Sequence, residues 1–253
     1  MGKTRKKKDH LNTTMSLGDH LEELRARLLL ALAGMLVAVI ICLIPFFFQH
    51  IKALIYYPLG KVSEKVSLIA LAPADPFVVY MKIALISGLI ISSPWVFYHL
   101  WMFVVSGLYP KEKRYVNLAV PFSAVLFVAG ALFFLRVVAP ISLRFFLGFG
   151  RFIGVKPNWT LQKYVSFVTT LMLVFGLGFQ TPIAIFFLNK TGLVSIQALK
   201  RSRKFVLLGV FIVAAVATPP DVISQITLAI PLYLLFELGI LLSHFTKRRG
   251  NQS

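Results

Sequence analysis

Two acidic positions stand out in a chain that is otherwise strongly basic. Glu22 and Glu23 lie within His20–Arg27, just before a run of 21 residues without a charge, and Glu112 lies in a short basic stretch. The chain has only nine acidic residues against 27 lysines and arginines. A carboxylate accepts two hydrogen bonds from the planar fork of a guanidinium group, which a lysine ammonium does not offer. Glu23 and Glu112 are therefore candidates for binding a ligand that carries arginine.

A simpler interpretation also fits the two acids. Glu23 and Arg27 are four residues apart, and a helix forms surface ion pairs at that spacing which contribute only about 0.3–0.5 kcal/mol. Glu112 lies between Lys111 and Lys113. On this interpretation both acids are local charge partners, and the residue types alone leave the two possibilities open.

The elements around these acids predict an all-α, polytopic membrane protein. Hydrophobic residues make up 58% of the 253 residues, well above the roughly 45–50% of soluble proteins. About 20 apolar helical residues cover the ~30 Å hydrocarbon core of a bilayer. Gln49–Asp75 and Ala139–Lys163 are predicted to be loops, because they contain several prolines and glycines. Six transmembrane helices are predicted, at Leu28–Phe48, Phe77–Val105, Tyr115–Val138, Tyr164–Leu188, Phe205–Ala217 and Val222–Leu242.

The basic residues predict the orientation of these helices. Six crossings place both termini on one side, and that side holds 18 of the 27 lysines and arginines, against eight on the other side. Positive charge marks the cytoplasmic side, so both termini are expected to be cytoplasmic. The net charge of +18 is spread over short clusters between apolar runs, which is typical of membrane proteins and argues against nucleic-acid binding. We expect a basic cytoplasmic extension without fixed structure at 1–14, a six-helix domain at 15–245 and a short basic tail at 246–253.

The fifth predicted helix is unusually short. Its 13 residues, Phe205–Ala217, reach only about 20 Å, roughly two thirds of the hydrocarbon core. A helix of that length thins the bilayer locally or leans against protein. Pro219 and Pro220 connect it to the sixth helix. We therefore expect the short fifth and sixth helices to give the bundle a concave, lipid-facing corner.

Several classes of chemistry find no support in the sequence. Cys42 is the only cysteine, which excludes a disulfide within the chain and a cysteine-based metal site. The five histidines are scattered, and neither a zinc-protease helix, a serine-hydrolase elbow nor a nucleotide-binding loop occurs. We expect no enzyme activity, no cofactor and no metal.

A few polar residues interrupt the apolar runs. Gln180, close to Pro182, lies deep in the fourth span, where an amide needs a partner. That partner is either another helix of the bundle, the backbone freed by Pro182, or a separate subunit. Asp221 is placed to cap the sixth helix, and Glu237 is expected to reach cytoplasmic water or a basic partner. Lys82 is expected to extend toward the outer surface.

Five short stretches make the chain similar to the TatC family, the multispanning core of the twin-arginine protein translocase. The resemblance covers Met15 to about Phe245, and the order and membrane-edge placement of the stretches make it specific. It implies a protein of the bacterial cytoplasmic (inner) membrane that binds paired arginines in the export signals of folded cargo, with energy from the proton gradient. The stretches are His20–Arg25, Ser93-Pro94, Tyr98–Phe103, Leu108–Arg114 and Thr218–Gln225.

The resemblance also implies a signal-peptide site. The signal-binding glutamates of the family match Glu23 and Glu112, whereas Glu22 has no such match and is expected to be a solvated neighbour. Apolar residues near Glu112 form either a ledge for the hydrophobic part of the signal or an interfacial aromatic belt together with Trp101. The residues expected at this site are Glu23, Glu112, Arg25, Phe103, Leu108 and Tyr109.

The implied partners are twin-arginine signal peptides, small single-span subunits of the TatA and TatB type, further copies of the chain and the lipid bilayer. TatC proteins often carry glutamate at position 180, so Gln180 excludes a proton-titrating role there. Residues expected at partner or intramembrane polar sites are Gln180, Asp221 and Glu237, and residues expected to be structural are Pro58, Pro94, Pro219 and Pro220. The alternatives are a secondary small-molecule transporter, for which no internal repeat is evident, and an intramembrane enzyme.

Overall fold

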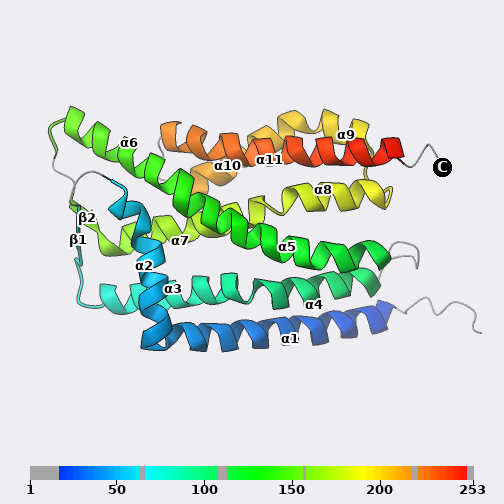
Figure 1. The fold of residues 1–253 in the computed structure, drawn as a ribbon, viewed down its shortest axis with the longest axis horizontal. Coiled ribbons are helices and arrows are strands. Elements are labelled where there is room, and N and C mark those ends of the chain that lie inside the picture. Colours follow the sequence, from blue (N-terminus) through cyan, green and yellow to red (C-terminus); the bar gives the residue numbers. More distant parts are fainter. Residues whose placement is uncertain (1–16, 63–65, 107–112, 156–157, 218–221, 250–253) are drawn as a thin grey trace, which may run out of the picture.

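The first predicted span is two helices that meet at a proline. The computed structural model describes residues 17–62, 66–106, 113–155, 158–217 and 222–249. Helix α1 spans Leu17–Leu43 and α2 spans Pro45–Gly60. Ile44 between them is extended, and Pro45 starts α2 because its fixed φ suits the first turn and its missing N–H is not needed there. Helix α2 then crosses one end of the bundle, roughly perpendicular to α1 (Figure 1).

The region after α1 was therefore predicted wrongly. Gln49 to Gly60 is helical rather than looped, and Pro58 lies buried inside the last turn of α2. Burial explains the helix, because Ile55 is 1% exposed and Phe48, Ile51 and Tyr56 pack against the main core. Packing against the bundle outweighs the turn signal that a proline carries in isolation.

The second predicted span is broken near its middle. Helix α3, Asp75–Ile91, and α4, Ser93–Ser106, meet at an angle of 54°. Pro94 at the second position of α4 has no N–H to continue the hydrogen bonds of α3, which places the bend at Ser92.

The third span continues much further than predicted. Helix α5, Lys113–Phe133, passes through a π-helical turn, Phe134–Val138, into α6, Ala139–Phe152. Ala139 to Phe152 was predicted to be a loop. The helix persists because Pro140 stands in the first turn of α6, where a proline is tolerated, and because Ala139, Leu143 and Leu147 bury one face.

The remaining elements complete the bundle. Helices α7, Leu161–Gly178, and α8, Thr181–Lys190, form the fourth span, with Gln180 at their junction. The short α9, Ile196–Arg201, leads into α10, Arg203–Ala217. Helix α10 has 15 residues and so covers about 22 Å, which keeps it shorter than a bilayer core. The last helix, α11, is long rather than short: it spans Val222–Arg249 and so includes part of the predicted tail.

Two short strands join segments that were both predicted to be loops. Strand β1, Ser67–Ile69, pairs in parallel with β2, Asn158–Thr160, with Leu68 opposite Trp159. The pairing lies at the same end of the bundle as α2 and the end of α6 (Figure 1). The all-α prediction missed this contact, because two three-residue strands carry too little periodicity to be recognised.

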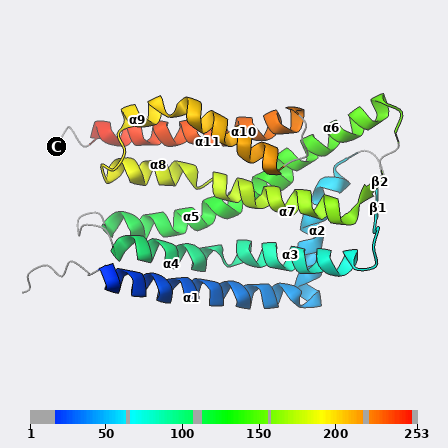
Figure 2. The ribbon, with the colours of Figure 1, turned by 180° about the vertical axis from the view of Figure 1, so that it is seen from behind.

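Helix α7 supplies much of the core. Val165, Val168, Leu171 and Phe175 are fully buried, as is Phe134 in the π-helical turn. Figure 2 shows α7 lying between α3 on one side and α10 on the other. The central helix therefore connects the first half of the chain with the last two helices.

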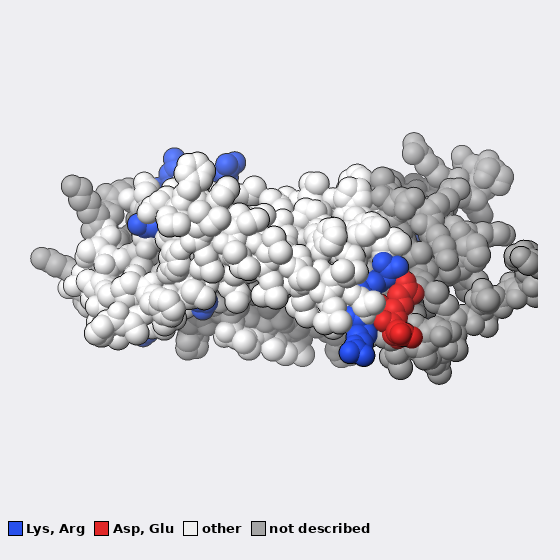
Figure 3. Space-filling view, turned by 90° about the horizontal axis from the view of Figure 1, so that it is seen from below, with Lys and Arg blue, Asp and Glu red and all other residues white. Residues whose placement is uncertain are grey.

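The surface agrees with a membrane protein. Four helical stretches are long and apolar enough to cross a bilayer, and the bent α3–α4 pair makes a possible fifth among the described residues. Figure 3 shows a long uncharged band between charged ends, with acidic side chains over the first turns of α1. The polytopic, helical fold is confirmed, whereas the count of six crossings includes the short α10 and stays a prediction.

Candidate functional site

Both described chain ends lie at one end of the bundle. The beginning of α1, the end of α4, the beginning of α5, the α8–α9 connection and the end of α11 gather there (Figure 1). The opposite end carries α2, β1, β2 and α6. This grouping matches the predicted partition of the chain between the two sides of the membrane, with the basic clusters on the side of the termini.

Glu23 holds a guanidinium group at this end of the bundle. The Nη2 and Nε atoms of Arg27 lie 2.6 Å and 2.8 Å from the same Glu23 oxygen, Oε1. The Arg27 and Glu23 side chains are only 23% and 20% exposed. The local ion pair predicted from the four-residue spacing is therefore present, and it is more sheltered than an ordinary surface pair. Glu22 and Arg25 on the same helix are exposed.

Helix α4 packs along α1 beside this pair. The Trp95 Nε1–H donates to the Leu30 carbonyl at 2.9 Å, which sets the register between the two helices. The helices run in opposite directions (Figure 1), so each turn further along α4 faces one turn earlier in α1. His99 therefore lies level with Arg27, and Phe103 lies level with Glu23. Phe103 is half-buried at this place.

Several predicted site residues fall outside the described part of the chain. Glu112, Leu108 and Tyr109 belong to the α4–α5 connection, and Asp221 with Pro219 and Pro220 belongs to the α10–α11 connection. Their expected roles stay predictions. Among the residues expected at the signal-peptide site, the described structure places Phe103 of α4 level with Glu23 of α1.

Gln180 finds its partner within the bundle. Its Nε2 donates to the Ser123 carbonyl at 2.9 Å, and the Trp101 Nε1–H donates to the Ser123 hydroxyl, also at 2.9 Å. Ser123 of α5 thus connects α4 with the α7–α8 junction, and the serine itself is 1% exposed. Of the alternatives left open by the sequence, the bond within the bundle is the one that the structure contains.

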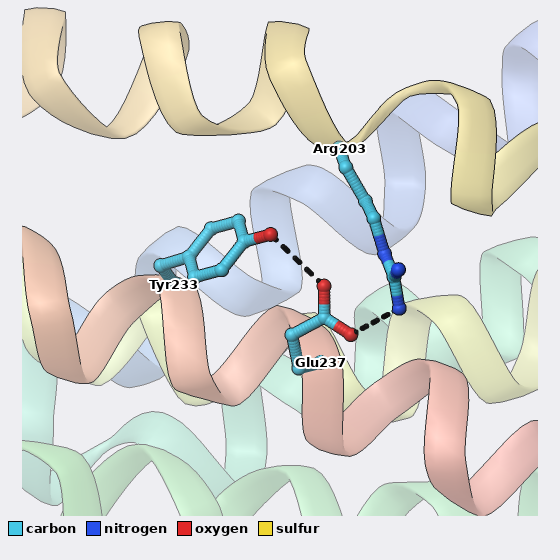
Figure 4. A network of polar contacts seen from close by, with 3 residues as sticks. All are labelled: Arg203, Tyr233 and Glu237. Carbon is cyan, nitrogen blue, oxygen red and sulfur yellow. Dashed lines mark hydrogen bonds and ion pairs between the residues drawn. The ribbon is translucent and has the colours of Figure 1, made fainter.

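Glu237 is also paired within the chain. The Arg203 Nη2 lies 2.6 Å from Glu237 Oε2, and the Tyr233 hydroxyl donates to Glu237 Oε1 at 3.0 Å (Figure 4). Arg203 begins α10 and Glu237 lies in α11, so the pair connects the last two helices. The basic partner that was expected for Glu237 is a residue of the same chain.

Lys82 does not simply extend to the surface. Its Nζ donates to the Ser166 hydroxyl at 2.9 Å, and the side chain is half-buried between α3 and α7. The described residues contain no group of three or more histidine, cysteine or acidic residues that would hold a metal ion.

An apolar groove opens on the face made by the last helices. It has a volume of about 490 Å³ and contains few polar atoms. Gly209 on α10 leaves room for close approach of another backbone, because nothing lies within 4 Å of a Cβ added there, whereas Gly178 is packed against Leu232 of α11. The lining residues come from α7, α8, α10 and α11: Val174, Leu177, Gly178, Thr181, Val206, Gly209, Val210, Val213, Leu232 and Phe236.

Sequence reasoning missed three of the residues that organise these contacts. Ser123 carries no signal of its own, because a lone serine in an apolar helix is common. Arg203 was counted only among the basic residues that predict the orientation of the helices in the membrane. His99 was noted as one of five scattered histidines and as part of the Tyr98–Phe103 stretch, but no role was predicted for it; it is 6% exposed and lies against the rings of Trp95 and Tyr98.

Comparison with known proteins places the chain in a family. The family described as "Sec-independent protein translocase protein (TatC)" matches residues 19–231. Curated proteins of that name are 40% identical in Azotobacter chroococcum mcd 1, over 89% of this chain and 88% of the relative, and 37% identical in Escherichia coli K12, over 94% and 91%. The Aquifex aeolicus relative is 35% identical, over 94% of this chain and 98% of its own length.

Solved structures agree. The crystal structure titled "Crystal Structure of Twin Arginine Translocase Receptor- TatC" has a TM-score of 0.81 and 35% identity, and the match covers 90% of this chain and 99% of that chain. A second structure of the same receptor in DDM has a TM-score of 0.82 at 36% identity, over 88% and 99%. The family match and these identities give no support to the small-molecule transporter alternative. The chain is a multi-pass membrane protein that belongs to the TatC family of the Sec-independent protein translocase.

Proposed function

We propose that this chain is the membrane receptor for twin-arginine export signals and that Glu23 binds an arginine of the signal. The observation that carries the proposal is the Glu23–Arg27 contact, in which a sheltered carboxylate accepts two N–H groups of one guanidinium. A carboxylate that accommodates one arginine side chain in this geometry has the chemistry for another. The solved relatives bear the name of twin-arginine translocase receptor, which supports the same role.

The surroundings of Glu23 suit a signal peptide that combines arginines with an apolar stretch. Phe103 lies level with Glu23 on α4, and Leu24 and Leu28 of α1 are exposed. Apolar surface beside a carboxylate accepts the hydrophobic part of a peptide while its arginine is held. Leu108, Tyr109, Glu112 and Arg25 complete the proposed site, with Glu112 receiving the second arginine.

Assembly with other membrane subunits is the second part of the proposal. The apolar groove between α7, α8, α10 and α11 contains few polar atoms, and Gly209 on its wall is open. Small residues let transmembrane helices approach closely, so a single-span helix of the TatA or TatB type suits this groove. We propose that the chain binds such subunits there and that the assembly of several copies uses the proton gradient for export.

The test measures binding of a twin-arginine signal peptide to the purified protein in detergent. Glu23→Gln preserves size and removes the charge, and it should weaken binding roughly tenfold to a hundredfold, because a charge-assisted hydrogen bond contributes about 1.5–3 kcal/mol. Glu22→Gln is the matched control, since it removes the same charge from an exposed neighbour. Equal affinity for the Glu23→Gln protein and the wild type would refute the role of Glu23.

A further inference from the structure

Arg27 already occupies the carboxylate that a signal arginine would need. Both of its contacts go to one oxygen: Nη2 lies at 2.6 Å and Nε at 2.8 Å from Glu23 Oε1. The pair lies within one helix, so it forms as soon as α1 folds and requires no ligand. In the resting protein, the proposed arginine site therefore contains a guanidinium of the chain itself.

A second acceptor lies level with Arg27. His99 on α4 is 6% exposed, and neither ring nitrogen has a hydrogen-bond partner among the described residues. Buried polar atoms are rarely left without a partner, because the loss of their hydrogen bonds to water is then not compensated. The Trp95–Leu30 contact fixes the register that brings His99 opposite Arg27. The positive charge of Arg27 also lies within electrostatic reach of the His99 ring.

The chemistry of these two groups is complementary. A neutral imidazole has one nitrogen that accepts a hydrogen bond, and a guanidinium offers five N–H donors and no acceptor. Arg27 has a flexible side chain, so it can leave Glu23 and turn toward α4 without moving the helix. His99 is thus placed to stabilise an Arg27 that has lost its carboxylate.

We propose that Arg27 is a resident competitor for the Glu23 carboxylate. The signal arginine displaces Arg27 from Glu23, and Arg27 then forms a hydrogen bond with His99. This inference rests on the proposed function of Glu23 as a signal-binding residue. The signal gains Glu23 by exchange, one guanidinium for another, and the cost of releasing Arg27 is reduced by its new hydrogen bond to the His99 imidazole.

The exchange makes Arg27 a residue that sets the affinity of the site for the signal. An incoming arginine replaces both donors that Arg27 gives to Glu23, so the number of hydrogen bonds to the carboxylate is preserved. An incoming lysine is a point charge that cannot reproduce the planar fork. Releasing Arg27 costs the same free energy whichever ligand displaces it, so the resident arginine lowers the affinity for both ligands by the same factor, and the preference for arginine comes from the fork geometry at Glu23.

The test compares signal peptides carrying Arg-Arg or Lys-Lys on purified wild-type, Arg27→Ala and Arg27→Lys proteins. Both substitutions remove the competing fork, and we expect Arg-Arg affinity to rise roughly two- to fivefold, with the same fold rise for Lys-Lys. Arg27→Lys keeps the positive charge, so a rise in Arg27→Ala alone would mean that only net charge matters and would overturn the proposal. Arg201→Ala is the matched control, because it removes an exposed arginine elsewhere on the described chain, and an equal rise there would overturn it too.

The role of His99 is tested by a double-mutant cycle. His99→Leu should weaken Arg-Arg binding when Arg27 is present and have no effect in the Arg27→Ala protein, and His99→Gln, which keeps an acceptor, should restore binding. An equal loss in both backgrounds would show a packing role and overturn the proposed acceptor. Glu23→Gln in the same series distinguishes a failure of the proposed receptor role from a failure of the proposed competition. Unchanged affinity of the Glu23→Gln protein refutes the receptor role of Glu23. Lost affinity of that protein, without a gain of affinity in the Arg27 variants, refutes only the competition by Arg27.

Discussion

Gln180 and Ser123, 57 residues apart in the chain, are joined by a 2.9 Å hydrogen bond from the amide Nε2 to the backbone carbonyl. The bond lies in the apolar part of the bundle and connects the α7–α8 junction with α5. Ser123 also accepts from Trp101 of α4, so three helices meet at one polar contact. The Gln180 amide is therefore stabilised by a hydrogen bond within its own bundle.

Gln180→Leu should destabilise the bundle without removing signal binding. The substitution removes one interhelical hydrogen bond, which contributes about 0.6 kcal/mol on average and up to ~1.7 kcal/mol within membranes. The measurements are thermal unfolding in detergent and affinity for a twin-arginine peptide, and Thr170→Val on α7 is the control for loss of a polar group elsewhere in the bundle. Unchanged stability together with loss of partner-subunit capture would show that position 180 acts toward a partner instead.

The Arg203–Glu237 pair should couple α10 to α11. Arg203 is 45% exposed and Glu237 is 29% exposed, so solvent screening limits the pair to about 0.2–1 kcal/mol. A double-mutant cycle with Arg203→Ala and Glu237→Ala, measured by unfolding in detergent, should give that coupling. Tyr233→Phe isolates the separate hydrogen bond of 3.0 Å to Glu237. Additive effects of the two alanine substitutions would contradict the coupling.

Gly88 is expected to be required for the contact between α1 and α3. A Cβ at this position would lie 2.8 Å from the backbone nitrogen and Cα of Val39, so the two helices would have to separate. Gly88→Ala should therefore cost about 1–3 kcal/mol of stability. Gly148→Ala on α6 is the control, because nothing lies within 4 Å of its added Cβ, and alanine there should raise helix stability by up to ~1 kcal/mol. Equal stabilities of both variants would refute the close packing.

The orientation is tested by cysteine labelling in a Cys42→Ala background. Gln197 on α9 lies at the end of the bundle with the described termini, and Ser67 of β1 lies at the opposite end; both are exposed. An impermeant thiol reagent added to intact cells should label a cysteine at Ser67 and leave one at Gln197 unlabelled. The reverse pattern would overturn the cytoplasmic placement of the termini, which rests on the positive-inside rule.

Much of the fold follows from the sequence alone. The apolar runs identify a polytopic helical protein, because a segment without charges that is long enough for a bilayer has few other stable environments. The Glu23–Arg27 pair also follows from local spacing, since helical geometry brings residues four apart together whatever the rest of the fold does. Pro45 and Pro94 stand at helix starts for an equally local reason, although the predicted spans ran through both of them.

Tertiary packing determined the structure of segments that local sequence signals predicted wrongly. Pro58 and Pro140 suggested loops, yet α2 and α6 are helical there because their apolar faces pack against the core. The β1–β2 pairing and the bonds of Gln180 to Ser123 and of Arg203 to Glu237 join residues 34 to 91 positions apart. Sequence determined which segments are helical and apolar; only the packing of those helices decided which polar side chains meet, because a buried polar group takes whichever partner the neighbouring helix brings within hydrogen-bonding distance.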